Sequence, residues 1–171
     1  MADEEISQAL NDLTYTSISL YVKDTPLKME DIFTFELNAL YVIKEDMYVR
    51  SSFDALPKGV RLYILSNHAT NQAQKDETSS TYILKAGSHF KLIGKPDYQG
   101  RGALILLHLP DKDWEEFTKD TFLIDTLLVN YATREFEVQC GSSDLIKSGE
   151  KQYISHPYCQ IEKVNLPKKK E

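Results

Sequence analysis

The sequence contains few cysteines: Cys140 and Cys159 are the two among 171 residues. Small secreted domains that depend on disulfides carry a higher density, so a disulfide framework is not predicted here. A chain of this length can bury about 70% of the surface that its unfolded form exposes, so its core needs neither disulfides nor metals. We expect both cysteines to be buried free thiols.

Long apolar runs are also absent. The longest covers residues 103–109 and is interrupted by His108, whereas a membrane-spanning helix needs roughly 20 apolar residues. The N-terminus is acidic and polar rather than basic, so it does not match the start of a signal peptide. We therefore expect a cytoplasmic protein without a membrane span.

An excess of positive charge is missing too. The chain has 20 Lys and Arg against 26 Asp and Glu, which gives a net charge of −6 and a pI near 5.3. Binding to duplex nucleic acid or to an anionic membrane surface depends largely on basic side chains. The charge balance therefore disfavours a nucleic-acid partner.

Motifs that carry chemistry are equally scarce. The four histidines are His68, His89, His108 and His156. Neither their spacing to one another nor their spacing to the cysteines is that of zinc ligands. Glycine-rich phosphate loops and the nucleophile elbow of hydrolases are absent. We predict no metal, no cofactor and no catalytic residue, and we lean against an enzyme.

The sequence does contain a repeated alternation of apolar and polar residues, which is the pattern of β-strands. The clearest alternation runs from Ile32 to Ile43, which is long enough to require a bend or a bulge. The run at 103–109 is typical of a strand covered on both faces. Shorter runs lie at 18–22, 47–51, 60–65, 81–84, 90–93 and 158–164. We predict a mainly β or α+β fold, an antiparallel barrel or sandwich of about eight to ten short strands.

Two helices are expected beside these strands. Ile6, Leu10 and Leu13 recur at helical spacing near the N-terminus, and their narrow apolar stripe must dock on another surface. A second helix is expected at 111–121, where acidic residues occupy the first turn.

The segment after the second helix allows two interpretations. Residues 122–129 could extend the helix or begin a strand. We favour the strand, because 127–132 and 135–140 can pair as a hairpin that places Tyr131 beside Phe136.

These elements predict three parts of the chain. Residues 1–13 form an N-terminal docking helix, residues 14–166 form a single β-rich domain, and residues 167–171 form a basic tail. A polar segment at 68–80 interrupts the domain, and loops of that length in compact domains are usually functional or mobile.

The most suggestive short motif is Gly100-Arg101-Gly102. Two glycines let backbone amides approach an anion, and an arginine can donate paired hydrogen bonds to a phosphate. A flexible hairpin loop explains the same residues without a ligand.

Three functional hypotheses follow. The first is a non-catalytic protein-interaction or assembly module in an intracellular complex, which docks on another protein or on a second copy through Ile6, Leu10 and Leu13. The 10 tyrosines favour such a contact surface. The alternative is a small β-barrel that binds a small anionic or nucleotide-like ligand at residues 100–102. The third is an enzyme without a recognisable motif that uses Cys140 or a histidine.

Overall fold

A computed structural model describes residues 19–25, 27–50, 60–66, 70–71, 81–98, 101–109, 123–142 and 161–164. Several predicted features lie outside the described residues. They are the docking helix with Ile6, Leu10 and Leu13, the helix at 111–121, most of the polar segment 68–80, and the basic tail.

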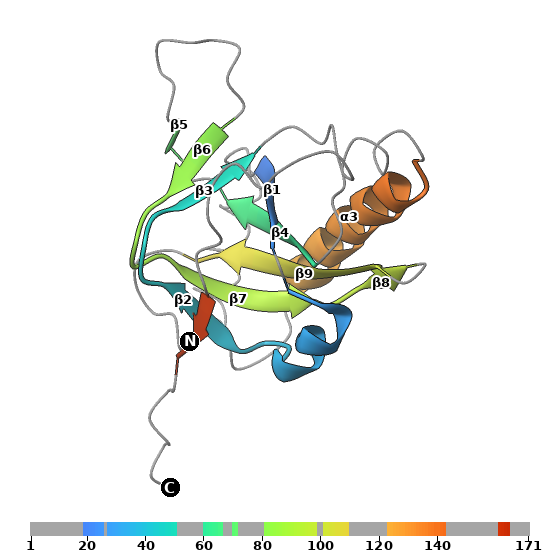
Figure 1. Ribbon diagram of the computed structural model, residues 1–171, viewed down its shortest axis with the longest axis horizontal. Coiled ribbons are helices and arrows are strands. Elements are labelled where there is room, and N and C mark those ends of the chain that lie inside the picture. Colours follow the sequence, from blue (N-terminus) through green and yellow to red (C-terminus); the bar gives the residue numbers. More distant parts are fainter. Residues whose placement is uncertain are drawn as a thin grey trace, which may run out of the picture.

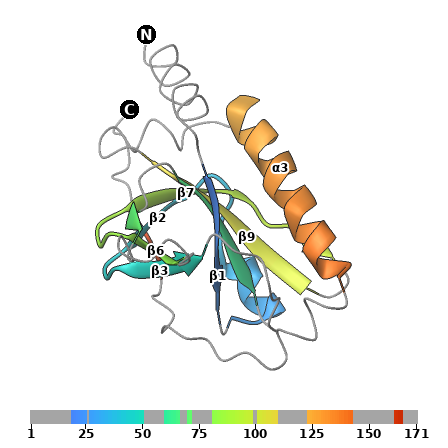
Figure 2. The ribbon, with the colours of Figure 1, turned by 90° about the horizontal axis from the view of Figure 1, so that it is seen from above.

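The described part of the chain is mainly β, as predicted, and forms a curled, half-barrel sheet with one α-helix (Figures 1 and 2). The strands are β1 (Ser19–Asp24), β2 (Leu40–Ile43), β3 (Met47–Arg50), β4 (Arg61–Ser66), β5 (Thr70–Asn71), β6 (Thr81–Leu84), β7 (His89–Gly94), β8 (Asp97–Tyr98), β9 (Arg101–His108) and β10 (Ile161–Lys163). The helices are the 3₁₀-helix η1 (Met29–Thr34) and the α-helix α3 (Leu123–Cys140). In this part of the chain, no helix is long and apolar enough to cross a membrane.

The strand order is β10-β2-β7-β9-β4-β1-β3-β6-β5, with β8 paired to β9 outside this path. The central pair, β4 and β9, is parallel, with Arg61 opposite Ala103 and Leu65 opposite Leu107. The other pairings in the described sheet are antiparallel. The predicted antiparallel barrel or sandwich is therefore confirmed only in part: the fold is mainly β, but the sheet is a curled half-barrel that is not antiparallel throughout. Parallel strands are usually covered on both faces, which is why β9 reads as an almost continuous apolar run.

Each face of the sheet carries its own buried cluster. On one face, Ala103, Ile105 and Leu107 of β9 pack in a cluster with residues of α3, and Figure 2 shows α3 lying along this side. On the other face, Leu104 and Leu106 join a second cluster with residues of β2, β7 and η1. The alternation along β9 thus divides one strand between two cores.

The long strand predicted from Ile32 to Ile43 is wrong over most of its length. The first residues form η1, and β2 begins only at Leu40. Phe33 is 82% exposed and Leu37 is 53% exposed, so the alternating apolar residues do not form the buried face of a strand. Asn38 has a φ of 66°, which turns the chain before β2.

The hairpin predicted at 127–132 and 135–140 is also wrong, because the segment is the helix α3. Leu128, Ala132 and Phe136 are buried at intervals of four residues, which is the spacing of one helix face. Tyr131 is 53% exposed and points away from the buried side that Phe136 occupies.

Candidate functional site

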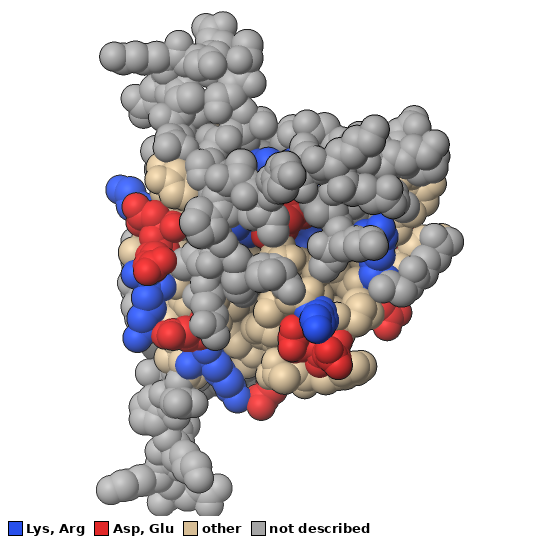
Figure 3. Space-filling model, in the orientation of Figure 1, with Lys and Arg blue, Asp and Glu red and all other residues tan. Residues whose placement is uncertain are grey.

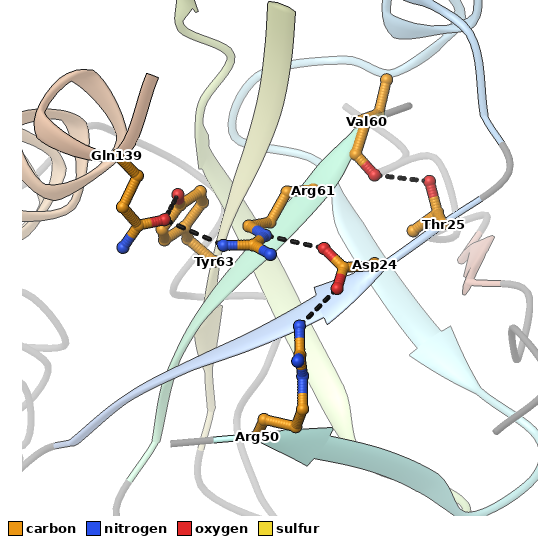
Figure 4. A network of polar contacts seen from close by, with 7 residues as sticks. All are labelled: Asp24, Thr25, Arg50, Val60, Arg61, Tyr63 and Gln139. Carbon is orange, nitrogen blue, oxygen red and sulfur yellow. Dashed lines mark hydrogen bonds and ion pairs between the residues drawn. The ribbon is translucent and has the colours of Figure 1, made fainter. Parts of the chain in front are cut away.

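Three strands bring charged side chains together on the sheet face that α3 covers. Asp24 of β1 lies opposite Arg61 of β4, and Arg50 of β3 lies opposite Val22 of β1. Arg61 Nε donates to Asp24 Oδ1 at 2.7 Å, and Arg50 Nη2 donates to Asp24 Oδ2 (Figure 4). One carboxylate therefore holds two guanidinium groups.

The last turn of α3 completes this cluster. Gln139 Oε1 accepts a hydrogen bond from Arg61 Nη1 at 2.9 Å and another from the Tyr63 hydroxyl. These contacts join α3 to β4 through side chains that are 78 and 76 residues apart in the sequence. We call Asp24, Arg50, Arg61, Tyr63 and Gln139 the arginine network (Figure 4).

The strand ends beside the arginine network are fastened by a separate contact. Thr25 Oγ1 donates to Val60 O at 2.6 Å, and the Thr25 amide donates to the same oxygen at 3.2 Å. Thr25 is 1% exposed. Since each residue directly adjoins a member of the network, this contact holds Asp24 and Arg61 in register.

Within the arginine network, two guanidinium groups share the single carboxylate of Asp24. Burial raises the pKa of Tyr63, against the opposing effect of the Arg61 charge, so its hydroxyl stays a proton donor. Burial also raises the pKa of Cys140, while Arg101 and Arg61 act to lower it. The Glu137 carboxylate acts in the same direction as burial and raises the pKa of Cys140 further.

Exposed charges on the described surface are arranged differently. Figure 3 shows Lys and Arg side chains interspersed with Asp and Glu. Lys163 Nζ lies 2.8 Å from Glu36 Oε2, and Lys44 Nζ lies 3.4 Å from Glu162 Oε2, with all four side chains at least 43% exposed. The arginine network is distinguished from these pairs by its burial.

The predicted anion motif falls at the start of β9. Arg101 is half-buried there, and Gly100 lies outside the described residues. Gly102 is explained by packing, because a Cβ on it would collide with Ile32 Cδ1 and lie 2.5 Å from Met29 Sδ. Anion binding at Arg101 stays a prediction.

A second buried polar pair lies at the opposite ends of β4 and β9. Ser66 Oγ and His108 Nδ1 are 2.7 Å apart, and the His108 ring lies 5.0 Å from the Phe90 ring. His108 is thus a satisfied core residue, as its place in an apolar run indicates. Within the described residues, no three His, Cys, Asp or Glu side chains gather as a metal site requires.

Sequence reasoning missed the arginine network. Arg61 stands at the head of a strand whose six residues are all buried, and a charged side chain in such a strand needs a buried partner. The sequence therefore contains a signal for a buried partner of Arg61. It does not identify Gln139 as that partner, because Gln139 belongs to a segment whose pattern was interpreted as a strand.

Comparisons with known proteins were made by sequence and by structure. No protein-family model matches the sequence, and no curated protein matches it. The structure resembles the Vis toxin, an ADP-ribosyltransferase from Vibrio splendidus, with a TM-score of 0.44, 9% identity, and coverage of 55% of this chain and 49% of that chain. It also resembles the ADP-ribosyltransferase HopU1 of Pseudomonas syringae pv. tomato, with a TM-score of 0.47, 11% identity, and coverage of 54% and 45%. The type III effector XopAI from Xanthomonas axonopodis pv. citri matches with a TM-score of 0.46, 9% identity, and coverage of 57% and 44%.

This chain therefore spans about half the length, or less, of these solved structures. The expectation of a non-catalytic interaction or assembly module, an adaptor or an oligomer, is corrected by these matches. Vis and HopU1 are named as enzymes, and none of the three is named as an adaptor. The activity of this chain has to be argued from its own residues.

Proposed function

We propose that this chain is an enzyme of nucleotide chemistry, which holds the phosphate groups of its substrate at the arginine network and transfers a group from that substrate. The observation that carries the proposal is that the Asp24 carboxylate holds two arginine side chains together, Arg61 in the interior and Arg50 nearer the surface. A planar guanidinium donates paired hydrogen bonds to phosphate, and such charge-assisted bonds are strong.

The arginine network runs from the interior toward the surface. The Arg61 side chain is 1% exposed, that of Asp24 is 12% exposed, and that of Arg50 is 24% exposed. Arg50 is therefore the arginine of the network that a dissolved anion meets first. Asp24 orients both guanidinium groups and accepts a hydrogen bond from each. We therefore do not assign it the role of a general base.

The reaction to test first is ADP-ribosyl transfer, the activity named for Vis and HopU1. With NAD as donor, the bond between C1′ of the ribose and the nicotinamide nitrogen breaks, and nicotinamide leaves with the electron pair. A nucleophile on the acceptor forms the new bond to C1′ and gives up its proton. The arginine network supplies binding energy to the pyrophosphate and places the ribose for attack.

The test is the release of nicotinamide from NAD by the full chain, measured with the transfer of labelled ADP-ribose to protein acceptors. Arg50→Gln should raise KM for NAD about 10- to 100-fold, because it removes a charge-assisted hydrogen bond. Arg134→Gln makes the same substitution on the exposed side of α3 and should leave KM within about threefold, since exposed charges contribute little.

Two results would overturn the proposal. One is a wild-type chain that neither releases nicotinamide nor transfers the label. The other is an Arg50→Gln variant with the KM of the wild type, since the arginine network would then not contact the substrate.

A further inference from the structure

Gln139 lies on the buried side of α3. It follows Leu128, Ala132 and Phe136 along the face that packs on the sheet, and it is 3% exposed. A long polar side chain at such a position must find hydrogen-bond partners, because water does not reach it.

The orientation of the Gln139 amide is determined by its neighbours. Arg61 Nη1 donates to Oε1 at 2.9 Å, and the Tyr63 hydroxyl donates to the same oxygen. A guanidinium can only donate, so a flipped amide would set the –NH₂ group against another donor. The carbonyl oxygen of Gln139 therefore faces the arginine network, and Nε2 points away from Arg61 (Figure 4).

Nε2 of Gln139 is buried without a hydrogen-bond acceptor among the described residues. An unmet buried donor costs stability, and native proteins rarely keep one without a role. The Arg61 guanidinium donates to the same amide group. A negatively charged oxygen of a ligand would accept the hydrogen bond that Nε2 can donate, and hydrogen bonds to charged groups are stronger than those between neutral groups.

We infer that Gln139 is a substrate-binding residue, whose Nε2 donates a hydrogen bond to an anionic oxygen of the ligand, a phosphate oxygen if the proposed function holds. The inference rests on the proposed function for the identity of the substrate, and on the buried amide for the contact itself. Arg61 and Tyr63 act as positioning residues, since they hold the amide in the donating orientation.

The decisive variant is Gln139→Glu, which keeps an oxygen for Arg61 and Tyr63 but removes both amide hydrogens. With inorganic pyrophosphate as probe, measured by isothermal titration calorimetry, we expect the affinity to fall about 10- to 100-fold. Asn130→Asp adds the same charge on the exposed side of α3 and should change the affinity by less than about threefold.

An uncharged variant separates the loss of a donor from charge repulsion. Gln139→Met removes both amide hydrogens and adds no negative charge, so repulsion of the anion cannot account for its effect. We expect the affinity of Gln139→Met for pyrophosphate to fall at least about tenfold. An affinity within about threefold of the wild type would overturn the inference.

A measurement on the wild type does not depend on how the variant folds. The side-chain amide protons of Gln139, followed by nuclear magnetic resonance with ¹⁵N-labelled protein, should shift downfield and exchange more slowly with water when pyrophosphate is added. Unchanged resonances at a saturating concentration would overturn the inference, as would a wild-type chain that binds no pyrophosphate.

The two proposals fail separately. Pyrophosphate binding through Gln139, without nicotinamide release, supports the inference and overturns the proposed function. Nicotinamide release that is equal in the wild type and in Gln139→Glu supports the proposed function and overturns the inference.

Discussion

Arg61 Nε lies 2.7 Å from Asp24 Oδ1, and the Arg61 side chain is 1% exposed. A cation this deeply buried is tolerated only with its charge paired and its donors satisfied. The two residues face each other across the β1–β4 pair, so the register of these strands places the Asp24 carboxylate beside Arg61. The ion pair therefore connects the stability of the sheet with the geometry of the candidate site.

Replacing Asp24 with Asn should destabilise the fold strongly. It leaves the buried charge of Arg61 and the neighbouring Arg50 without their shared counter-charge, and breaking a buried pair costs about 3–5 kcal/mol. Urea denaturation followed by circular dichroism measures this loss. The matched control is Glu162→Gln, which removes a carboxylate from an exposed pair with Lys44 and should cost less than about 1 kcal/mol. Equal losses in the two variants would contradict a special role for Asp24.

Tyr63 should make the fold sensitive to alkaline pH. Burial raises its pKa above the ordinary value of 10.0, so the folded state keeps the phenol protonated where the unfolded state ionises. Its contribution to stability is full below about pH 10 and is lost as the pH rises toward the folded-state pKa. Between about pH 9 and 11 the wild type should lose about 1 kcal/mol more than Tyr63→Phe. Urea denaturation at each pH measures the free energy of unfolding. An equal loss in the wild type and in Tyr63→Phe would contradict the prediction.

The sequence predicts most of the described strands, because alternation is a local property. The run at 103–109 became β9 and the run at 60–65 became β4. Their parallel pairing was not predictable in the same way, since it joins segments about 40 residues apart and depends on which faces other elements cover. Local pattern thus predicts the elements but leaves their order in the sheet open.

The failures have two different causes. At residues 32–39 the apolar residues alternate, yet Phe33 and Leu37 are exposed, so alternation did not report burial. At 123–140 the mixed sequence fits a hairpin as well as a helix, and tertiary packing on the sheet decides for the helix. Because Gln139 lies in this segment, the wrong interpretation also concealed the fifth member of the arginine network.

Gly102 should be replaceable only at a cost. Its missing Cβ leaves room for Ile32 and Met29 of η1 on β9, and forcing a methyl group into a packed contact costs about 1–3 kcal/mol. Gly102→Ala should therefore lower the free energy of unfolding by that amount. Gly141→Ala is the control, because its nearest atoms lie at 3.6 Å, and it should change stability by less than about 0.5 kcal/mol. An unaffected Gly102→Ala would mean that packing does not explain this glycine, and both earlier interpretations, an anion-binding motif and a flexible hairpin loop, would be open again.

Phe136 and Val138 distinguish the helix from the hairpin that the sequence favoured. In a strand, residues two apart share a face, so both would be buried or both exposed. In α3 they point in different directions: Phe136 is 1% exposed and Val138 is 64% exposed. Phe136→Ala should cost about 3–5 kcal/mol, because its ring packs edge-on against Tyr63 with centroids 5.7 Å apart.

Val138→Ala should stay within about 0.5 kcal/mol of the wild type, as surface substitutions do. Thermal and urea unfolding of both variants measures the difference. Comparable losses would indicate a strand over 135–140, and with it a different position for Gln139. The contrast between two residues on one short segment therefore tests the helix on which the arginine network and its buried amide depend.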